Sequence, residues 1–133
     1  MSTLVDTNVF VDVLKRDPVW FDWSVQALAR ATTRGGVLTN YVVYAELHTH
    51  DTAGPHIDEL LNQLQVSVAD LSRDAAQLAA NAFRHYRQRG GTKTGVLPDF
   101  FIGAHAQAQG LKLLTRDAGR YRAYFPKLKL ICP

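Results

Sequence analysis

The sequence predicts an α/β fold: a three-layer α/β/α sandwich around a central parallel sheet of about five strands. Short, β-favouring apolar segments alternate with longer segments whose apolar residues recur at helical spacing, which is typical of parallel βαβ units. With 133 residues the chain has the length of one domain, and we expect residues 1–133 to form a single domain. The content of 47% hydrophobic and 20% charged residues excludes the disordered and fibrous classes.

The chain begins with a predicted strand, a helix and a second helix. Residues 3–5 are apolar and β-favouring, and they lead directly into a helix start at Asp6. This helix ends before Pro18, because a proline disfavours helical backbone in the residue that precedes it. The spacing of apolar residues predicts a second helix from Val19 to about Thr33, and glycines 35 and 36 end it.

The middle of the chain repeats this alternation. Residues 37–39 predict the second strand, and Asn40 is placed to cap a helix over residues 41–47. A Gly54-Pro55 break then precedes a helix around Ile57 to Leu64. Residues 66–68 predict the third strand.

The last part of the chain completes the predicted sheet. A long helix is expected from about Ser72 to Arg89, followed by a glycine-rich loop at residues 90–95. A small apolar helix is expected from Phe100 to Ala108. Residues 111–114 and 128–131 predict the fourth and fifth strands.

Three aspartates lie at the predicted carboxyl edge of the sheet, where functional groups of parallel sheets collect. Asp6 follows the first strand, Asp117 follows the fourth strand, and Asp99 opens the apolar helix. Taken singly, each could be an ordinary helix cap, because aspartate is favoured at helix starts. Their shared position is what predicts a site.

Glu46 is a fourth acid, and capping does not explain it. It lies inside the helix after the second strand, roughly 1.5 turns from the helix start. It also interrupts a run of apolar residues, where an unpaired buried charge is costly. Convergent carboxylates repel and raise each other's pKa unless a cation holds them, so we expect a divalent metal site formed by Asp6, Glu46, Asp99 and Asp117.

The available ligands select the metal. Oxygen donors favour Mg²⁺, with Mn²⁺ possible, over zinc. His48 and His50 are two residues apart on a predicted helix and therefore point to different faces, and no cysteine cluster exists. Magnesium commonly works on phosphate substrates, where it activates a water and neutralises charge on the phosphate.

Four sequence blocks resemble the signatures of PIN-domain nucleases, in matching order and spacing. They are Leu-Val-Asp-Thr-Asn-Val-Phe (4–10), Tyr-Ala-Glu-Leu (44–47), Leu-Pro-Asp-Phe-Phe-Ile-Gly-Ala-His-Ala (97–106) and Leu-Thr-Arg-Asp (114–117). The final residues, 120–133, resemble the tail of the VapC branch, the toxins of type II toxin-antitoxin systems. The resemblance covers essentially the whole chain, and all four acidic positions match.

The resemblance implies a magnesium-dependent endoribonuclease that acts as a toxin, is neutralised by a cognate VapB-like antitoxin and forms a homodimer. It implies that Asp6 and Asp99 are the principal metal ligands, with Glu46 and Asp117 completing the site directly or through water. It places Asn8 and Thr115 beside the acids, where they would orient water or ligands; a cap or turn role is the alternative for both. It also implies a groove near the early helices that receives the antitoxin. The bound antitoxin would then cover part of the aromatic surface around Trp20 and Trp23.

A basic stretch before Asp99 contains candidate RNA contacts. We expect Arg87, Arg89 and Lys93 to be close enough to line one wall of the site, although a charge run at a helix end is often simply solvated. Arg116, which is adjacent to Asp117, is a better candidate than the more distant Arg120.

Two other functions remain open at this stage. The same acids could serve a structure-specific DNA nuclease, although the short domain has nothing extra to grip a duplex. A phosphate-receiver signalling domain is the non-catalytic alternative, with Asp70 near the end of the third strand as the modified residue. That alternative leaves Glu46 and Asp99 without a role.

The sequence also bears on the cellular compartment. Cys132 is the single cysteine, so an intrachain disulfide is impossible. The first residues lack the basic and apolar regions of a signal peptide, and no apolar stretch approaches the ~20 residues needed to cross a bilayer. We therefore expect a cytoplasmic protein without membrane contact.

Overall fold

Five short parallel strands form the centre of the structure. The structure is a computed structural model, and it describes residues 1–51 and 55–133. In chain order the elements are β1 (Thr3–Val5), α1 (Thr7–Leu14), α2 (Phe21–Thr33), β2 (Val37–Asn40), α3 (Tyr41–His50), α4 (His56–Gln63), β3 (Ser67–Ala69), α5 (Arg73–Gln88), α6 (Leu97–Ala108), β4 (Lys112–Leu114), α7 (Gly119–Tyr124) and β5 (Leu130–Ile131). The Gly54 side of the predicted break lies outside the described residues.

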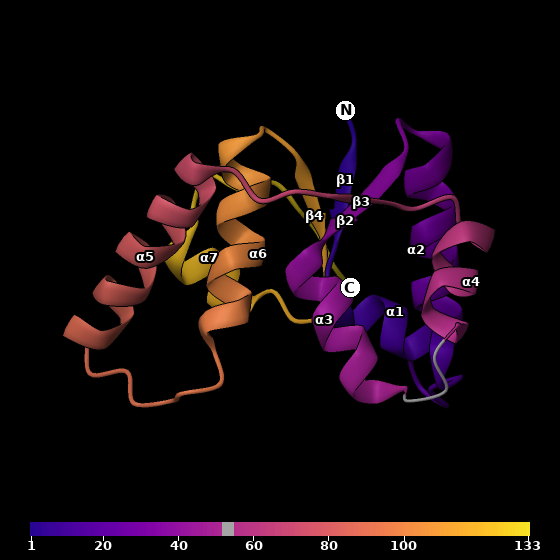
Figure 1. Cartoon of the computed structure of the whole chain (residues 1–133), viewed down its shortest axis with the longest axis horizontal. Coiled ribbons are helices and arrows are strands. Elements are labelled where there is room, and N and C mark those ends of the chain that lie inside the picture. The colour runs from indigo at the N-terminus through magenta and orange to yellow at the C-terminus, as the bar shows by residue number, and fades with distance from the viewer. Residues whose placement is uncertain (52–54) are drawn as a thin grey trace.

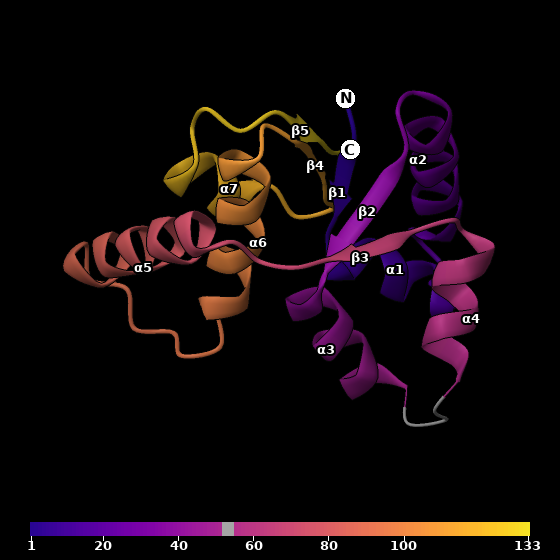
Figure 2. The ribbon, with the colours of Figure 1, turned by 45° about the horizontal axis from the view of Figure 1, so that its top comes forward.

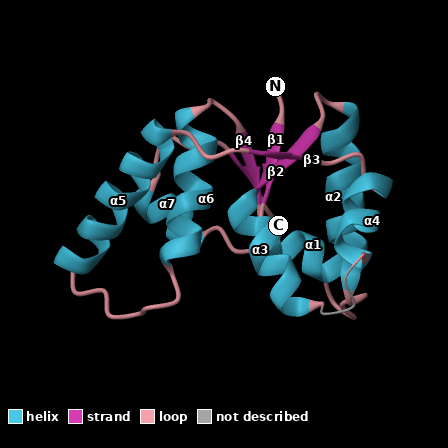
Figure 3. Cartoon of the chain, in the orientation of Figure 1, coloured by secondary structure: helices cyan, strands magenta, loops and turns pink. Residues whose placement is uncertain are grey.

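The sheet has the strand order β3-β2-β1-β4-β5, and all its paired strands are parallel. Helices lie on both sides of it: α1, α2 and α4 on one side and α5, α6 and α7 on the other (Figure 1). The turned view separates the same two groups, and colouring by secondary structure shows the strands between them (Figures 2 and 3). The predicted three-layer α/β/α sandwich is confirmed.

Most predicted elements are present, with shifted ends. The start of α6 was predicted at Phe100, but the helix begins three residues earlier. Pro98 lies in its first turn, where a missing amide hydrogen costs no helical hydrogen bond. The short helix α7 was not predicted, since six residues carry too little periodicity to reveal a helix.

Strand register brings the ends of β1 and β4 together. Val5 is paired with Leu114, and the backbone N–H of Asp6 donates to the Leu114 carbonyl at 2.9 Å. The next residues of the two strands, Asp6 and Thr115, are therefore neighbours. Both leave the sheet at its carboxyl edge, over a core in which Val5 and Leu114 are fully buried.

Gly103 allows α7 to pack closely on α6. A Cβ at this position would lie 2.6 Å from the ring of Phe125 and 3.1 Å from that of Tyr121. Both aromatic side chains are almost fully buried. The close approach of the two helices places the Tyr121 hydroxyl at the carboxyl edge of the sheet.

None of the helices in the described part of the chain combines the length and the apolar character that a membrane span requires.

Candidate active site

A pocket of about 270 Å³ opens at the carboxyl edge of the sheet, and all four predicted acids line it. Asp6 lies at the β1–α1 junction, Glu46 on α3, Asp99 in the first turn of α6, and Asp117 between β4 and α7. The complete lining comprises Asp6, Thr7, Asn8, Val11, Glu46, His50, Asp99, Arg116, Asp117, Arg120 and Tyr121. Residues from four separate parts of the chain therefore converge, as strand topology predicts.

Asp6 is the most buried acid of the pocket, with 4% of its surface exposed. Its Oδ2 accepts hydrogen bonds from the hydroxyls of Thr115 at 2.8 Å and Tyr121 at 2.9 Å. Its Oδ1 accepts the backbone N–H of Thr7 at 2.7 Å, and Asp6 is the N-cap of α1. Asp6 is thus both a helix cap and a pocket acid, and Oδ1 retains more capacity for a further ligand than Oδ2 does.

Burial strongly perturbs Asp6. It raises the pKa of the carboxyl from 3.8 to about 6, against the opposing effect of the hydrogen bonds from Thr115 and Tyr121, and the charge of Asp99 adds to the rise. Burial also raises the pKa of Tyr121 well above 10, followed by the charges of Asp6 and Asp99. Tyr121 therefore remains a protonated hydrogen-bond donor to Asp6 at neutral pH.

Glu46 is half-buried, and the Thr7 hydroxyl donates to its Oε1 at 2.6 Å. Burial raises the pKa of Glu46 and repulsion by Asp99 adds to this effect, while the Thr7 bond opposes it. The prediction that this carboxylate needs a partner is consistent with these contacts, because a hydrogen-bond donor from α1 reaches it.

Asp99 is the acid whose charge raises the pKa of both Asp6 and Glu46. Burial raises the pKa of Asp99 and repulsion by Asp117 adds to it, whereas a hydrogen bond from Arg120 opposes the rise. Arg120 Nη1 lies 2.5 Å from Asp99 Oδ2. Because Asp99 also raises the pKa of Asp6 and Glu46, the pocket carries an excess of negative charge that one arginine only partly offsets.

The donor set fits a divalent cation that prefers oxygen ligands, since it consists of carboxylates, and burial and repulsion between the acids raise the pKa of Asp6, Glu46 and Asp99. Within residues 1–51 and 55–133, however, no three His, Cys, Asp or Glu side chains are positioned as a ready-made metal site. Glu46 accepts a hydrogen bond from Thr7, and Asp99 accepts one from Arg120. A cation would have to draw the carboxylates together.

Asn8 and Thr115 occupy the positions predicted beside the acids. Thr115 is fully buried, donates to Asp6 and accepts the backbone N–H of Asp117 at 3.1 Å. The side-chain amide of Asn8 lies 3.3 Å from the Thr115 hydroxyl, and its carbonyl accepts the Arg116 N–H at 3.0 Å. Together they fix the β4–α7 turn and the orientation of Asp6.

Arg116 lines the pocket, but its guanidinium is committed to another partner. It makes two hydrogen bonds to the buried Asp12, at 2.9 and 3.0 Å, and lies over the ring of Trp20. Asp12 also accepts the Ser24 hydroxyl at 2.7 Å. This network joins α1, α2 and the β4–α7 turn, and it was not foreseen in the sequence.

Five residues that line the pocket were not among the predicted site residues: Thr7, Val11, His50, Arg120 and Tyr121. Thr7 lay inside a recognised block and needed only the expectation that a hydroxyl beside Asp6 can reach α3. Arg120 was judged too distant, because α7 was not predicted and its turn is what brings Arg120 to Asp99. Tyr121 has one usable signal, the four-residue spacing to Phe125 that marks a buried helix face.

The basic stretch lies outside the pocket lining. Arg87 packs over Phe83 and Arg89 over Tyr124, while the Lys93 backbone N–H donates to the Tyr86 hydroxyl. The end of α5 and the loop after it lie at the same end of the molecule as the start of α6 (Figure 1). The expectation that Arg87, Arg89 and Lys93 line one wall of the site is wrong, because none of them lines the pocket, and they remain predicted RNA contacts outside it.

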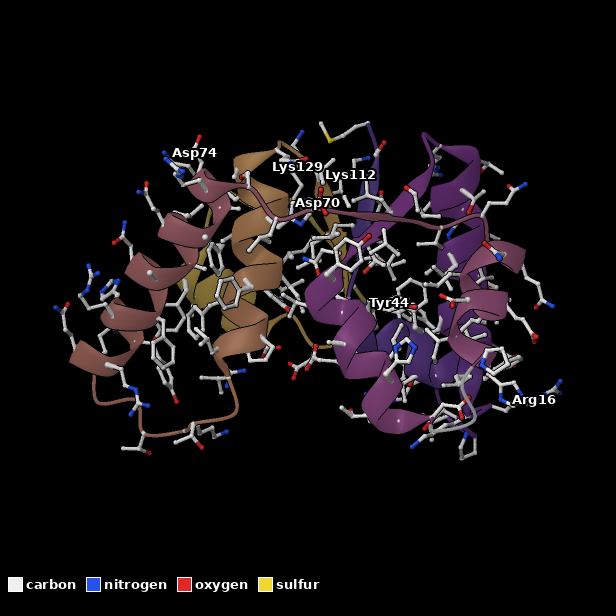
Figure 4. All side chains as sticks on the ribbon, viewed as in Figure 1. Arg16, Tyr44, Asp70, Asp74, Lys112 and Lys129 are labelled. Carbon is white, nitrogen blue, oxygen red and sulfur yellow. The ribbon has the colours of Figure 1, made fainter. Side chains whose placement is uncertain are left out.

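The alternative centre at Asp70 is separate from this pocket. Asp70 is exposed and follows the edge strand β3, on the segment that leads to α5 (Figure 4). It is not among the residues that line the acidic pocket. The four convergent acids therefore have no part in a site at Asp70.

Comparisons with known proteins agree with this architecture. The family model described as PIN domain matches residues 3–126. A chain of the crystal structure of VapBC2 from Rickettsia felis bound to a promoter DNA fragment has a TM-score of 0.76 at 19% identity, covering 99% of this chain and 98% of that one. A toxin-antitoxin complex from Klebsiella pneumoniae gives 0.71 at 22% identity, with 98% and 96% covered. FitAcB from Neisseria gonorrhoeae gives 0.68 at 23%, with 97% and 96% covered. No curated protein sequence matches significantly.

Proposed function

The chain belongs to the PIN domain family, and from this premise we propose that it is a magnesium-dependent endoribonuclease, the toxin of a type II toxin-antitoxin system. The observation that carries the proposal is the convergence of Asp6, Glu46, Asp99 and Asp117 on one pocket. Burial and mutual repulsion raise the pKa of Asp6, Glu46 and Asp99, which means that their charged forms are destabilised. A divalent cation bound between them would stabilise the charged forms.

The four acids would hold Mg²⁺, or Mn²⁺ in its place. When bound, the ion supplies positive charge beside the scissile phosphate and a water of lowered pKa for hydrolysis of the phosphodiester. The protein supplies orientation: Thr115 and Tyr121 hold Oδ2 of Asp6, and Thr7 holds Glu46. Such second contacts keep ligating carboxylates in position and are commonly needed for metal affinity.

RNA as the substrate rests on the resemblance to VapC toxins and on the charge of the chain. The net charge of +3 coexists with an acidic pocket lined by only two arginines, so most of the cations lie outside the pocket and can bind a polyanion. Arg87, Arg89 and Lys93 are the proposed contacts to the RNA backbone. The alternative substrate, structured DNA, uses the same pocket chemistry and is distinguished by assay.

A VapB-like antitoxin is the proposed partner. Structurally similar chains come from structures of VapBC2, of FitAB and of a toxin-antitoxin complex, which supports this assignment. A groove between α1, the start of α2 and α4 would receive an antitoxin segment. Its lining combines apolar side chains with charged ones: Val13, Leu14, Arg16, Phe21, His56, Glu59, Leu60 and Gln63.

Homodimer formation is the second proposed association. An almost entirely apolar groove lies between α3 and α6, lined by Tyr41, Val42, Ala45, Glu46, Leu97, Pro98 and Phe101. Tyr41 and Leu97 are among the exposed large hydrophobic residues of the described chain. Covering this groove with a second copy would bury apolar surface immediately beside the acidic pocket. The cytoplasm is the proposed compartment, where the free thiol of Cys132 would persist.

The test is incubation of the purified protein with cellular RNA and, in parallel, with DNA of matched length. The proposal expects cleavage of RNA in Mg²⁺, and loss of cleavage with a chelator and in Asp6→Asn. Arg122→Ala is the matched control, because Arg122 lies on α7 outside the pocket and should leave cleavage unchanged. Cleavage that survives both the chelator and Asp6→Asn would overturn the mechanism, and preferential cleavage of DNA would overturn the substrate.

A further inference from the structure

We infer that Arg120 is a substrate-binding residue with two positions: it neutralises Asp99 in the metal-free protein, and it contacts an RNA phosphate once the carboxylates hold a metal. This inference rests on the proposed function and deepens it. It assigns to the site a cation that comes from the chain itself.

The contact that carries the inference is the ion pair of Arg120 with Asp99. Arg120 Nη1 lies 2.5 Å from Asp99 Oδ2, and both side chains keep partial access to solvent, 25% and 32%. Both residues line the acidic pocket. Among the described residues, this is the one salt bridge made to any of the four acids.

Comparison with Arg116 shows which arginine is free to move. Arg116 makes two hydrogen bonds to Asp12, a carboxylate with 2% side-chain exposure, and is held against Trp20. Arg120 makes a single side-chain hydrogen bond within the described part of the chain. A guanidinium has five N–H donors, so most of those of Arg120 are available to another acceptor.

The charges of the pocket explain why the pair would open. Asp99 is repelled by the other acids of the pocket. Its charge raises the pKa of Asp6 and Glu46, and the charge of Asp117 raises the pKa of Asp99 itself. A divalent cation at these carboxylates would compete with Arg120 for Asp99. The released guanidinium would then lie beside the position of the scissile phosphate, and its planar fork suits a phosphate oxygen pair.

Metal affinity gives the first test, and it does not depend on catalysis. Calorimetric titration with Mn²⁺ compares the wild type, Arg120→Ala and the control Arg122→Ala, which removes the same charge from the same helix outside the pocket. Arg120→Ala should bind Mn²⁺ about tenfold more tightly, because the competitor for Asp99 is gone. Arg122→Ala should match the wild type. Arg120→Lys keeps the charge but loses the planar fork of the guanidinium, so its Mn²⁺ affinity should lie between those of the wild type and Arg120→Ala.

RNA binding gives the second test. Fluorescence anisotropy with a short mixed-sequence RNA is measured in Ca²⁺, which takes the same carboxylate ligands, and in chelator, with intact RNA verified on a gel. In Ca²⁺ the Arg120→Ala variant should bind RNA about tenfold more weakly, as expected for a lost charge-assisted phosphate contact. In chelator it should bind as the wild type does, because Arg120 is then held by Asp99.

Two outcomes overturn the inference: unchanged metal affinity in Arg120→Ala, or an equal loss of RNA affinity with and without Ca²⁺. Either result leaves the proposed function intact if the wild type binds metal and cleaves RNA. A wild type that binds neither metal nor RNA would instead refute the proposed function itself.

Discussion

The hydroxyl of Thr7 donates a 2.6 Å hydrogen bond to Oε1 of Glu46 and so joins the start of α1 to α3. The same residue donates its backbone N–H to Asp6. One residue therefore positions two of the four acids, which come from segments that lie far apart in the sequence.

Replacement of Thr7 should weaken the metal site. Thr7→Val removes the hydroxyl but keeps the shape and the backbone bond to Asp6, so Glu46 loses its orientation. We expect a loss of Mn²⁺ affinity of about 10-fold to 100-fold by calorimetry. Thr7→Ser, which restores the hydroxyl, should recover most of this loss. Equal affinities for the Val and Ser variants would show that the Thr7 bond has no role in metal binding.

The raised pKa of Asp6 predicts how the metal-free protein responds to pH. The folded-state pKa is about 6, against 3.8 for the ordinary group. Between these values the folded protein retains a proton that the unfolded chain has released, so stability falls as the pH rises through this window. The loss attributable to Asp6 is up to about 3 kcal/mol.

Urea denaturation of the wild type and Asp6→Asn in chelator measures this effect. The difference between the two curves matters, because asparagine cannot titrate while other groups titrate in both proteins. The stability of the wild type should decline relative to Asp6→Asn from about pH 4 to about pH 6. If the stabilities of the wild type and Asp6→Asn changed in parallel across this pH range, the raised pKa of the buried Asp6 carboxyl would be contradicted.

Replacement of Arg116 should mainly lower the stability of the fold. Arg116→Ala leaves the carboxylate of Asp12 buried, with Ser24 as its remaining side-chain partner. Breaking one partner of a buried ion pair is costly, and we expect the free energy of unfolding to fall by about 3 kcal/mol in urea denaturation. A variant of unchanged stability and reduced RNA affinity would instead support the role of Arg116 as an RNA contact.

The acidic pocket was predictable because the acids stand in a local relationship to secondary structure. Asp6 directly follows β1, and the parallel register then makes it a neighbour of Thr115 at the end of β4. Asn40 was predicted as a helix cap, and its side chain accepts the Val43 N–H at 3.0 Å. Signals that span a few residues thus positioned most of the elements and the edge on which the acids meet.

The pairing of the cations could not be predicted in the same way. Arg116 and Arg120 are only four residues apart in the sequence. Arg116 nevertheless binds Asp12 on α1, whereas Arg120 binds Asp99 on α6. Which arginine faces which acid depends on the direction of α7, and that direction depends on Gly103 admitting Phe125. Such contacts arise from packing between distant segments, for which a single sequence carries no local pattern.

The apolar groove between α3 and α6 predicts a specific dimer mutation. Tyr41 is 54% exposed in the first turn of α3, where an acidic residue suits the helix, so Tyr41→Glu should fold normally. A charge in the groove should weaken self-association by at least about tenfold in sedimentation analysis. Val19→Glu, at a more exposed apolar residue outside the groove, is the control. A wild type that is monomeric, or a Tyr41→Glu dimer of unchanged affinity, would exclude this interface.

The central claim is that these four carboxylates form a divalent metal site, and calorimetric titration of Asp99→Asn with Mn²⁺ tests it most directly. Asp99 interacts with all three other acids, so its neutralisation should weaken binding by at least about 100-fold. The matched control is Asp74→Asn, an exposed acid in the first turn of α5 that does not line the pocket (Figure 4). It should bind as the wild type does. Equal Mn²⁺ affinity in the wild type and Asp99→Asn would contradict the metal site.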